Sequence, residues 1–355
     1  MDKKLLIVED EETLCESLKR VLSKEGYVVD TVNNAESALS MQQERTYDLI
    51  VTDIILPGMT GIELIRKIKE DNPEQIVVVM TAYASLETAV EALRAGSYDY
   101  IVKPVMHEEI KQIVKNAISQ KVLQKENFLL KCQLENRYDI GTISLYKSPA
   151  MRALIEEIKG IAESETNLLV LGDTGTEKEL CAKLLHSIRK TQKPFIPIQC
   201  NTSDTNSLRQ AFEAADGGII FLDDILCLNS DLQAMLLTLL KDWNMRIIAA
   251  ADRGVESAAE KGAFSRELLQ TISGVKIRIP SLIERKEDIS PLANYFAQKY
   301  AEEFCSAVKS LDDRAQELLN NYDWPGNVRE LQNVIERAVL ICRGDTIKPK
   351  HLPLK

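Results

Sequence analysis

Acidic, hydroxyl and ammonium side chains follow the ends of successive apolar runs in the first third of the chain. Glu9 and Asp10 close the first run, Asp53 the third and Thr81 the fourth, and Lys103 follows the fifth. Crowded carboxylates are costly unless a cation joins them, and an all-oxygen ligand set suits Mg²⁺. With a metal screening the incoming group, a carboxylate can attack phosphorus as an acyl-phosphate nucleophile. The pattern therefore predicts a phosphate-accepting site.

The elements that must position these side chains are short strands alternating with helices. Helix-period segments such as residues 13–24, 61–70 and 86–94 lie between the apolar runs. Such alternation predicts a parallel sheet covered on both faces, with ligands beyond the carboxyl ends of its strands. The expected strands are residues 5–8, 28–31, 49–52, 76–80 and 100–102.

Two segments carry a family resemblance. Residues 51–59, VTDIILPGM, and the tripeptide Val102-Lys103-Pro104 resemble the receiver domain of bacterial response regulators, and the likeness covers residues 3–119. It implies Asp53 as the phosphoacceptor, with a sensor histidine kinase as the donor. It also implies Lys103 as the phosphate-binding lysine and Thr81 and Tyr100 as a switch pair. The implied Mg²⁺ ligands are Glu9, Asp10, Asp53 and the backbone carbonyl of Ile55.

A second chemical motif, residues 172–178 (GDTGTEK), has the outline of a phosphate-binding loop with one acid too many. Such loops turn consecutive backbone N–H groups toward phosphate, and glycines permit the turn. Glu177 stands where the loop favours glycine. A unit charge at 4 Å is worth roughly 4 kcal/mol at an effective dielectric near 20, here repulsive toward phosphate. Lys178 is expected to pair locally with Glu177 or Glu179.

Four segments in order resemble one larger family. Residues 148–151, 172–179, 217–224 and 324–331 are similar to the AAA+ domain of NtrC-like, sigma-54-dependent transcription activators, over about residues 142–355. The resemblance implies ATP as a cofactor. The vestigial nucleotide site would comprise Gly172, Gly175, Lys178, Glu179, Asp223, Asp224 and Arg329.

The departures from this family concentrate in the catalytic parts. Asp224 replaces the glutamate that would polarise water, and Asp252 replaces the sensor asparagine. Ser265 and Thr271 stand at the positions of the arginine fingers, which are worth about 10³–10⁵ in rate. Arg329 is retained at the second sensor, where we favour a structural salt bridge. These losses predict a domain that no longer hydrolyses ATP.

Two loops and one domain of the family are also expected to be missing. Only the ten residues from Thr202 to Ala211 occupy the place of the insertion that carries the GAFTGA loop, which grips sigma-54. Residues 241–245 run almost directly into the sensor strand, so the second loop of that face is absent. The chain stops at residues 352–355, where relatives continue into a helix-turn-helix domain. We therefore expect no direct DNA binding.

The fold class is α/β, with a receiver domain (a five-stranded, doubly wound parallel sheet) followed by an AAA+ α/β domain with a C-terminal helical lid. The predicted domains are residues 1–120, the receiver; 121–141, a helical linker; 142–285, a degenerate AAA+ α/β subdomain; and 286–355, the lid. The helix that includes the linker is predicted from about His107 to Asn136. Its partial heptad suits either a solvated linker or a dimerising coiled coil.

The composition argues against several classes of protein. The net charge of −10 argues against broad, charge-driven nucleic-acid binding. No stretch approaches the roughly 20 apolar residues of a membrane span, and the apolar run at the amino terminus is too short for a signal peptide. Seven scattered cysteines without a CxxC pair indicate a reduced, cytoplasmic protein.

The leading hypothesis is a response regulator that signals through a non-catalytic AAA+ domain by binding an output protein. The alternative is an ATP-binding transcription regulator, related to the sigma-54 activators, with weak or partner-dependent ATPase activity. Lys178, Asp223 and Arg329 motivate the alternative.

Overall fold

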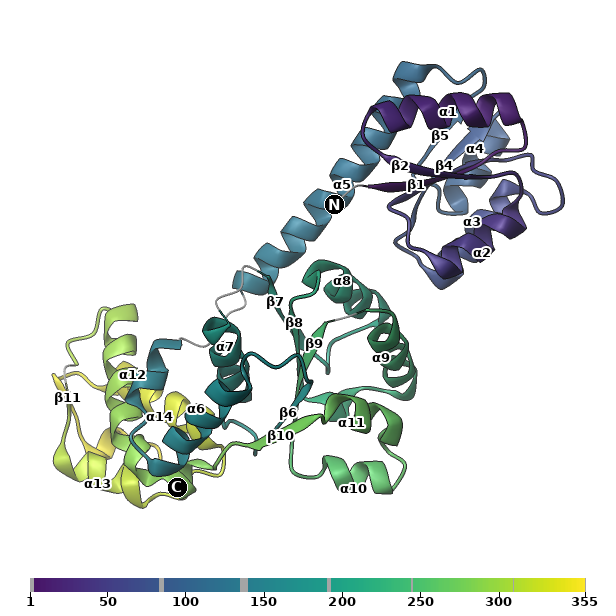
Figure 1. The fold of residues 1–355 in the computed structure, drawn as a ribbon. Coiled ribbons are helices and arrows are strands. Elements are labelled where there is room, and N and C mark those ends of the chain that lie inside the picture. Colours follow the sequence, from purple (N-terminus) through teal and green to yellow (C-terminus); the bar gives the residue numbers. More distant parts are fainter. Residues whose placement is uncertain are drawn as a thin grey trace. The chain divides into compact units, whose positions relative to one another are not determined.

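The protein is described by a computed structural model that covers residues 3–82, 86–134, 140–189, 193–243, 245–308 and 310–354. The chain divides into two compact units, Met1–Asn127 and Phe128–Lys355. Each unit contains a five-stranded sheet with helices on both of its faces (Figure 1).

The first unit is a doubly wound sheet in the strand order β2-β1-β3-β4-β5, and every pair in it is parallel. The predicted fold class is confirmed. The strands are β1 (Lys4–Val8), β2 (Val28–Val32), β3 (Leu49–Asp53), β4 (Ile76–Thr81) and β5 (Asp99–Val102). The helices are α1 (Glu12–Lys24), α2 (Ala35–Glu44), α3 (Gly61–Asp71), α4 (Leu86–Arg94) and α5 (His107–Leu134).

Alternation along β1 shows why both faces of this sheet are covered. Leu5 and Ile7 enter one core, which Leu18 of α1 and Val114 of α5 complete. Leu6 and Val8 enter the opposite core with residues of α2, α3 and α4. Successive side chains of a strand point to opposite faces, so a continuous apolar run needs helices on both. The carboxyl ends of the strands are thereby left as one open edge.

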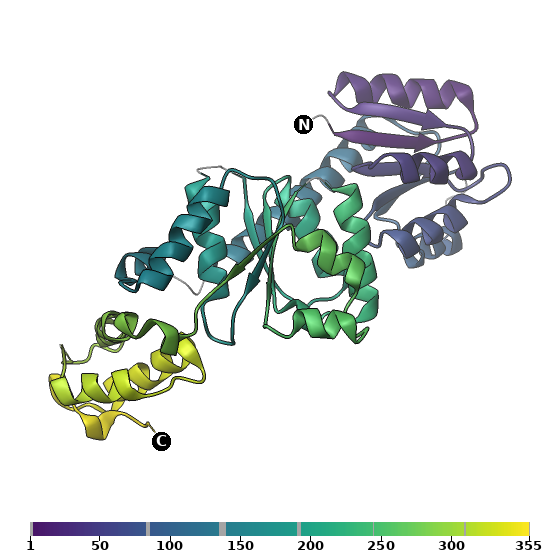
Figure 2. The ribbon, with the colours of Figure 1, turned by 60° about the horizontal axis from the view of Figure 1, so that its bottom comes forward.

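The second unit has the strand order β10-β6-β9-β8-β7, again all parallel. Helices α6 and α7 cover one face of this sheet and α8 to α11 the other (Figures 1 and 2). The strands are β6 (Leu168–Leu171), β7 (Phe195–Gln199), β8 (Ile219–Asp223), β9 (Arg246–Ala251) and β10 (Val275–Arg278). The helices are η1 (Ile140–Leu145), α6 (Pro149–Ile161), α7 (Lys178–Ile188), α8 (Thr205–Ala215), η2 (Ile225–Cys227), α9 (Ser230–Asp242), α10 (Val255–Glu260) and α11 (Arg266–Ile272).

A helical lid completes the second unit and shares the core of α6 and α7. Trp324, with 1% of its surface exposed, is the largest side chain buried there. The lid elements are η3 (Leu282–Asp288), α12 (Ile289–Glu303), β11 (Ser310–Leu311), α13 (Asp313–Asn321), α14 (Asn327–Ile341), β12 (Thr346–Ile347) and η4 (Pro349–His351).

Apolar runs in the sequence predict strands of the second sheet at residues 168–171, 219–222 and 246–250, and the structure contains two more strands. They are β7 and β10, and both lie at sheet edges. An edge strand is only half covered, so its sequence lacks a continuous apolar run. Pro197 interrupts β7, and Lys276 and Arg278 of β10 are exposed. Proline is tolerated at an edge because the ladder loses no interior hydrogen bond there.

Helix α5 begins at His107 as predicted and is described to Leu134, while the predicted end at Asn136 lies outside the described residues. The division between the two units falls within this helix. Phe128 and Leu129 pack against a core of the second unit. The predicted limits of the linker, residues 121–141, stay a prediction.

Candidate functional site

The acidic residues of the first unit meet at the carboxyl edge of its sheet. Asp53 ends β3 and Thr81 ends β4, while Glu9 and Lys103 directly follow β1 and β5. The parallel register aligns these ends, because Val8 pairs with Thr52, Asp53 with Met80 and Thr81 with Val102. Strand topology alone thus gathers groups that are far apart in sequence.

Lys103 binds both buried acids of this edge. Its Nζ lies 2.5 Å from Oδ2 of Asp53 and 2.8 Å from Oε2 of Glu9. Only 5% of Asp53 and 1% of Glu9 is exposed, whereas Asp10 is exposed. Burial raises the pKa of the Glu9 carboxyl. Burial also lowers the pKa of Lys103, but hydrogen bonds to Asp53 and Glu9 outweigh it, and the net pKa is raised. The charged lysine therefore compensates the buried carboxylates.

A carboxylate trio at the same edge fits a hard cation. Oxygens of Glu9, Asp10 and Asp53 all lie within 4.8 Å of one another. Oε2 of Glu9, although close to Lys103, is buried and has no partner of hydrogen-bonding geometry among the described residues. Oxygen ligands of this kind are those that Mg²⁺ prefers. The residues present thus fit a divalent cation.

The other residues singled out from the sequence lie around this centre. The Ile55 N–H donates to Oδ1 of Asp53 at 3.2 Å, and the Ile55 side chain is exposed. Thr81 is buried at the end of β4. Tyr100 lies on β5 with 38% of its surface exposed. Their roles as metal ligand and switch pair stay predictions.

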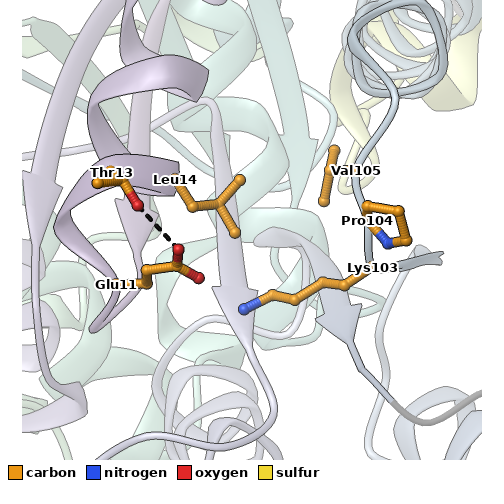
Figure 3. Close-up of a pocket in the computed structure, with 6 residues that line it drawn as sticks. All are labelled: Glu11, Thr13, Leu14, Lys103, Pro104 and Val105. Atoms are coloured by element: carbon orange, nitrogen blue, oxygen red, sulfur yellow. Dashed lines mark hydrogen bonds between the residues drawn. The ribbon is translucent and has the colours of Figure 1, made fainter.

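A surface cavity of about 540 Å³ opens beside Lys103 (Figure 3). Glu11, Thr13 and Leu14 form one wall, and Lys103, Pro104 and Val105 form the other. The Thr13 hydroxyl donates to the Glu11 carboxylate at 2.8 Å. The cavity leaves one side of the Lys103 side chain accessible.

The loop between β6 and α7 has the backbone of a phosphate-binding loop. Glu177, the residue before α7, adopts a left-handed conformation with φ 69° and ψ 46°. Glycine is favoured in that region because it has no Cβ. Gly175 is also left-handed, with φ 81°, and a Cβ there would lie 2.2 Å from the Gly326 carbonyl oxygen. Position 177 therefore has a backbone conformation that favours glycine, although its residue is glutamate.

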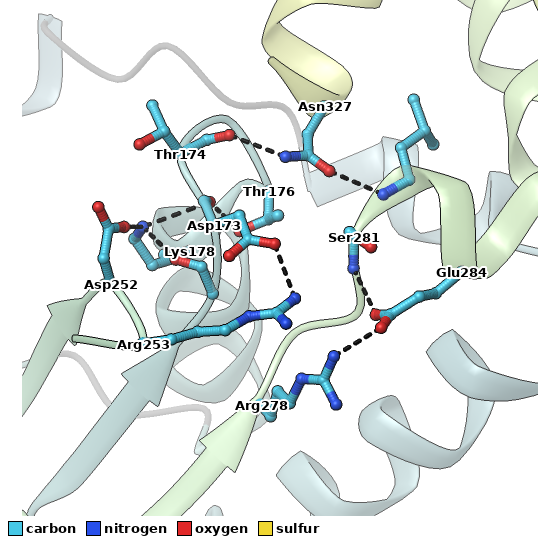
Figure 4. Close-up of polar contacts among 12 residues, drawn as sticks. Asp173, Thr174, Thr176, Lys178, Asp252, Arg253, Arg278, Ser281, Glu284 and Asn327 are labelled. Atoms are coloured by element: carbon cyan, nitrogen blue, oxygen red, sulfur yellow. Dashed lines mark hydrogen bonds and ion pairs between the residues drawn. The ribbon is translucent and has the colours of Figure 1, made fainter. Parts of the chain in front are cut away.

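The lysine of this loop is bound by the protein itself. Lys178 Nζ donates to the carbonyl of Gly172 at 2.8 Å and to Oδ1 of Asp252 at 3.0 Å (Figure 4). The prediction that Lys178 pairs with Glu177 or Glu179 is wrong. Glu179 instead pairs with Lys183 at 2.9 Å, one helical turn away. Asp252, on the loop after β9, reaches the lysine because β6 and β9 are neighbours.

The Glu177 carboxylate is also held in the interior. It accepts a hydrogen bond from the Tyr146 hydroxyl, and the Arg285 guanidinium lies 5.3 Å from the centre of the Tyr146 ring. Glu177 is therefore not an exposed carboxylate that repels phosphate, as its position in the sequence had suggested. Sequence reasoning missed Tyr146 and Arg285, although an acid at a glycine position signals the need for a buried partner.

The acids at the end of β8 make local contacts. Asp223 is half-buried, and its Oδ2 accepts from Gln199 Nε2 at 3.2 Å. Asp224 is exposed and accepts from the Cys227 thiol at 3.2 Å. At the positions of the arginine fingers, Ser265 caps α11 by accepting from the Leu268 N–H at 3.2 Å.

The lid contacts the loop through backbone groups. Gly175 O accepts from the N–H of Val328 at 3.0 Å and of Arg329 at 3.3 Å. Asn327 Nδ2 donates to the carbonyl of Thr174 at 3.0 Å (Figure 4). The Arg329 side chain is exposed and forms no ion pair with another described residue, so the expected structural salt bridge is not seen.

Comparison with known families assigns most of the chain. Residues 5–115 match the response regulator receiver domain, residues 145–282 the sigma-54 interaction domain, and residues 283–355 the AAA+ ATPase lid domain. Among the described residues, no helix combines the length and apolarity needed to cross a lipid bilayer.

Individual relatives match along nearly the whole chain. Transcriptional regulatory protein ZraR of Escherichia coli strain K12 is 34% identical over 99% of this chain and 86% of its own length. Regulatory protein AtoC of the same strain is 34% identical, over 99% and 83%. The crystal structure of NtrX from Brucella abortus in complex with ATP shares 28% identity with a TM-score of 0.56, over 99% of this chain and 84% of that one.

Proposed function

Because this chain belongs to the NtrC-like family of two-component response regulators, in which a receiver precedes a sigma-54 interaction domain of the AAA+ class, we propose that Asp53 accepts a phosphoryl group from a sensor histidine kinase. The observation that carries the proposal is the buried Asp53 carboxylate, held 2.5 Å from the Lys103 ammonium. We place this exchange in the cytoplasm as part of the same proposal.

The chemistry follows from the residues at the sheet edge. An Asp53 oxygen attacks phosphorus, the bond between phosphorus and the donor's leaving atom breaks, and an acyl phosphate forms. Lys103 then neutralises part of the added charge, and Thr81 supplies a hydroxyl at the same edge. Glu9, Asp10, Asp53 and the Ile55 carbonyl would hold Mg²⁺, which supplies further charge neutralisation when bound.

Labelling by a small phosphodonor tests the phosphoacceptor. Wild-type protein incubated with radiolabelled acetyl phosphate and Mg²⁺ should acquire an acid-labile label, and Asp53→Ala should acquire none. Asp71→Asn, an exposed acid at the end of α3, is the matched control and should label as wild type. A persistent label on Asp53→Ala would refute the assignment.

For output, we propose that the second unit binds a protein partner without hydrolysing ATP. The Lys178 ammonium donates to the Gly172 carbonyl and the Asp252 carboxylate. Ser265, at the position of an arginine finger, caps α11 instead. A pull-down with wild type against Asp53→Glu protein would identify the partner. Recovery of the same proteins by both forms would argue against a phosphorylation-controlled output.

A second candidate is an ATP-binding regulator with weak or partner-dependent ATPase activity. It is favoured by the retention of Lys178 beside Asp252 and of Asp223 at the end of β8, and by the ATP complex of the NtrX relative. Titration calorimetry with Mg-ATP separates the two candidates. Absence of heat at millimolar nucleotide would remove the second.

We further propose that α5 mediates a homodimer, rather than serving only as a solvated linker. Leu123 exposes 64% of its surface on this helix, and the adjacent Val122 exposes 39%. An apolar residue on a seam is buried by a second helix in a coiled coil. Analytical ultracentrifugation should show a dimer that Leu123→Asp dissociates and Lys121→Asp does not. A monomeric wild type would favour the solvated linker.

A further inference from the structure

Arg285 is a fully buried guanidinium with few partners. It lies in η3, and its Nη2 donates to the Thr176 carbonyl at 3.4 Å. Its Nε and Nη1 atoms have no hydrogen-bond partner among the described residues. A buried charge is strongly unfavourable unless opposite charge or an aromatic face compensates it. The neighbours of Arg285 must therefore supply that compensation.

Tyr146 and Glu177 are those neighbours. The Tyr146 ring faces the guanidinium, and its hydroxyl donates to the Glu177 carboxylate. Burial raises the pKa of Glu177, while Tyr146 and the charge of Arg285 lower it in part. We call these three residues the Tyr146 cluster. They come from the segment before α6, from the loop before α7 and from the start of the lid, so the cluster joins three separate parts of the unit.

The Tyr146 cluster also closes the apolar space beside the loop. Tyr146 lines a residual cavity between η1, α6 and α7, together with Met151, Leu154, Leu180 and Cys181. Its volume is about 10 Å³. Pockets for small organic ligands measure roughly 300–1,000 Å³, and about 10–15 Å³ holds a single water molecule. The space between η1, α6 and α7 beside this loop is therefore too small for a nucleotide base.

Backbone and side-chain hydrogen bonds join the lid to the loop. The Val328 and Arg329 N–H groups donate to Gly175 O, and Asn327 bridges the Thr174 carbonyl and the Leu282 N–H. Arg285 adds a contact to Thr176 from the lid side.

We propose that the Tyr146 cluster is an internal substitute for nucleotide, which fills the base side of the loop and holds the lid closed in the absence of ATP. The inference rests on the proposed function, in which the second unit does not hydrolyse ATP. It gives a physical cause for the lack of ATP hydrolysis. It also implies that the lid keeps the same position at every nucleotide concentration.

Amide hydrogen exchange on the full chain tests the role of the cluster in closing the lid. Tyr146→Phe removes one hydroxyl from the cluster, so exchange at the Val328 and Arg329 amides should rise by about tenfold. Amides of the interior strand β8 should keep their wild-type rates. Tyr300→Phe removes a different buried hydroxyl of the lid, which contacts Gln332, and should leave the two amides unchanged. Unchanged exchange in Tyr146→Phe would overturn the inference.

Calorimetry with Mg-ATP tests whether the cluster fills the nucleotide site. Wild type and Glu177→Gly should give no binding heat at about 5 mM nucleotide, since Tyr146 still fills the site. The double variant Tyr146→Gly/Glu177→Gly should bind ATP. A folded double variant without binding would overturn the inference and leave the proposed function standing. Binding by wild type would also overturn the inference, while the proposed function would fail only if the bound ATP were hydrolysed. If the double variant does not fold, the exchange experiment decides.

Discussion

The Tyr146 hydroxyl donates a hydrogen bond to the Glu177 carboxylate inside the second unit, although 31 positions separate the two residues in sequence. The bond gives a partner to an acid that looks misplaced in a phosphate-binding loop. Glu177 is therefore a buried structural residue on a backbone shaped for glycine.

Glu177→Gly should lower the stability of the second unit. Glycine relieves a left-handed backbone strain of roughly 1–2 kcal/mol. Removing the acid, however, leaves the buried Tyr146 hydroxyl without its acceptor and weakens the compensation of Arg285, and each loss costs about 1–3 kcal/mol. Urea unfolding should therefore show a net loss of about 2 kcal/mol. Asp216→Gly, an exposed left-handed residue with φ 44°, is the control and should be neutral or stabilising. Equal behaviour of the two variants would contradict the role of Glu177.

Glu177 should also give the second unit a distinctive pH dependence. Burial raises the pKa of this carboxyl above its ordinary value of 4.5. The folded state then binds more protons than the unfolded state between those two pKa values, so the unfolding free energy falls as pH rises through that window. Glu177→Gln removes the titration. Its stability relative to wild type should increase as pH rises from the ordinary pKa of 4.5 towards the raised pKa of the folded state. A constant difference across that range would show that the pKa is not raised.

Mg²⁺ should stabilise the first unit through the carboxylate edge. A ligand that binds only the folded state adds roughly 1–3 kcal/mol at saturation, so the thermal midpoint should rise on adding Mg²⁺. Asp10→Asn removes an exposed carboxylate of the trio and should abolish most of the rise. Asp30→Asn, on β2, should retain it. An equal rise in both variants would place the metal elsewhere.

Much of the first unit could be predicted from sequence, because the alternation of apolar runs with helix-period segments determines its parallel sheet. The buried run of β3, for example, fixes a central parallel strand, and parallel strands bring Asp53 and Glu9 to one edge. The edge strands β7 and β10 could not be found the same way, since half-covered strands carry no continuous apolar signal.

The partners inside the second unit could not be predicted either. Lys178 meets Asp252, and Tyr146 meets both Glu177 and Arg285, through tertiary contacts with no local sequence pattern. Local spacing favoured Glu177 or Glu179 as partner of Lys178, but the positions of β6 and β9 determine the pair that forms.

Steady-state ATP hydrolysis by the full chain, with and without a phosphorylated Asp53, tests the central claim most directly. The Lys178→Ala variant sets the background. We predict that wild type at saturating Mg-ATP releases phosphate no faster than this variant in either state, because the Tyr146 cluster occupies the site. Turnover within about tenfold of an intact family member would contradict the account.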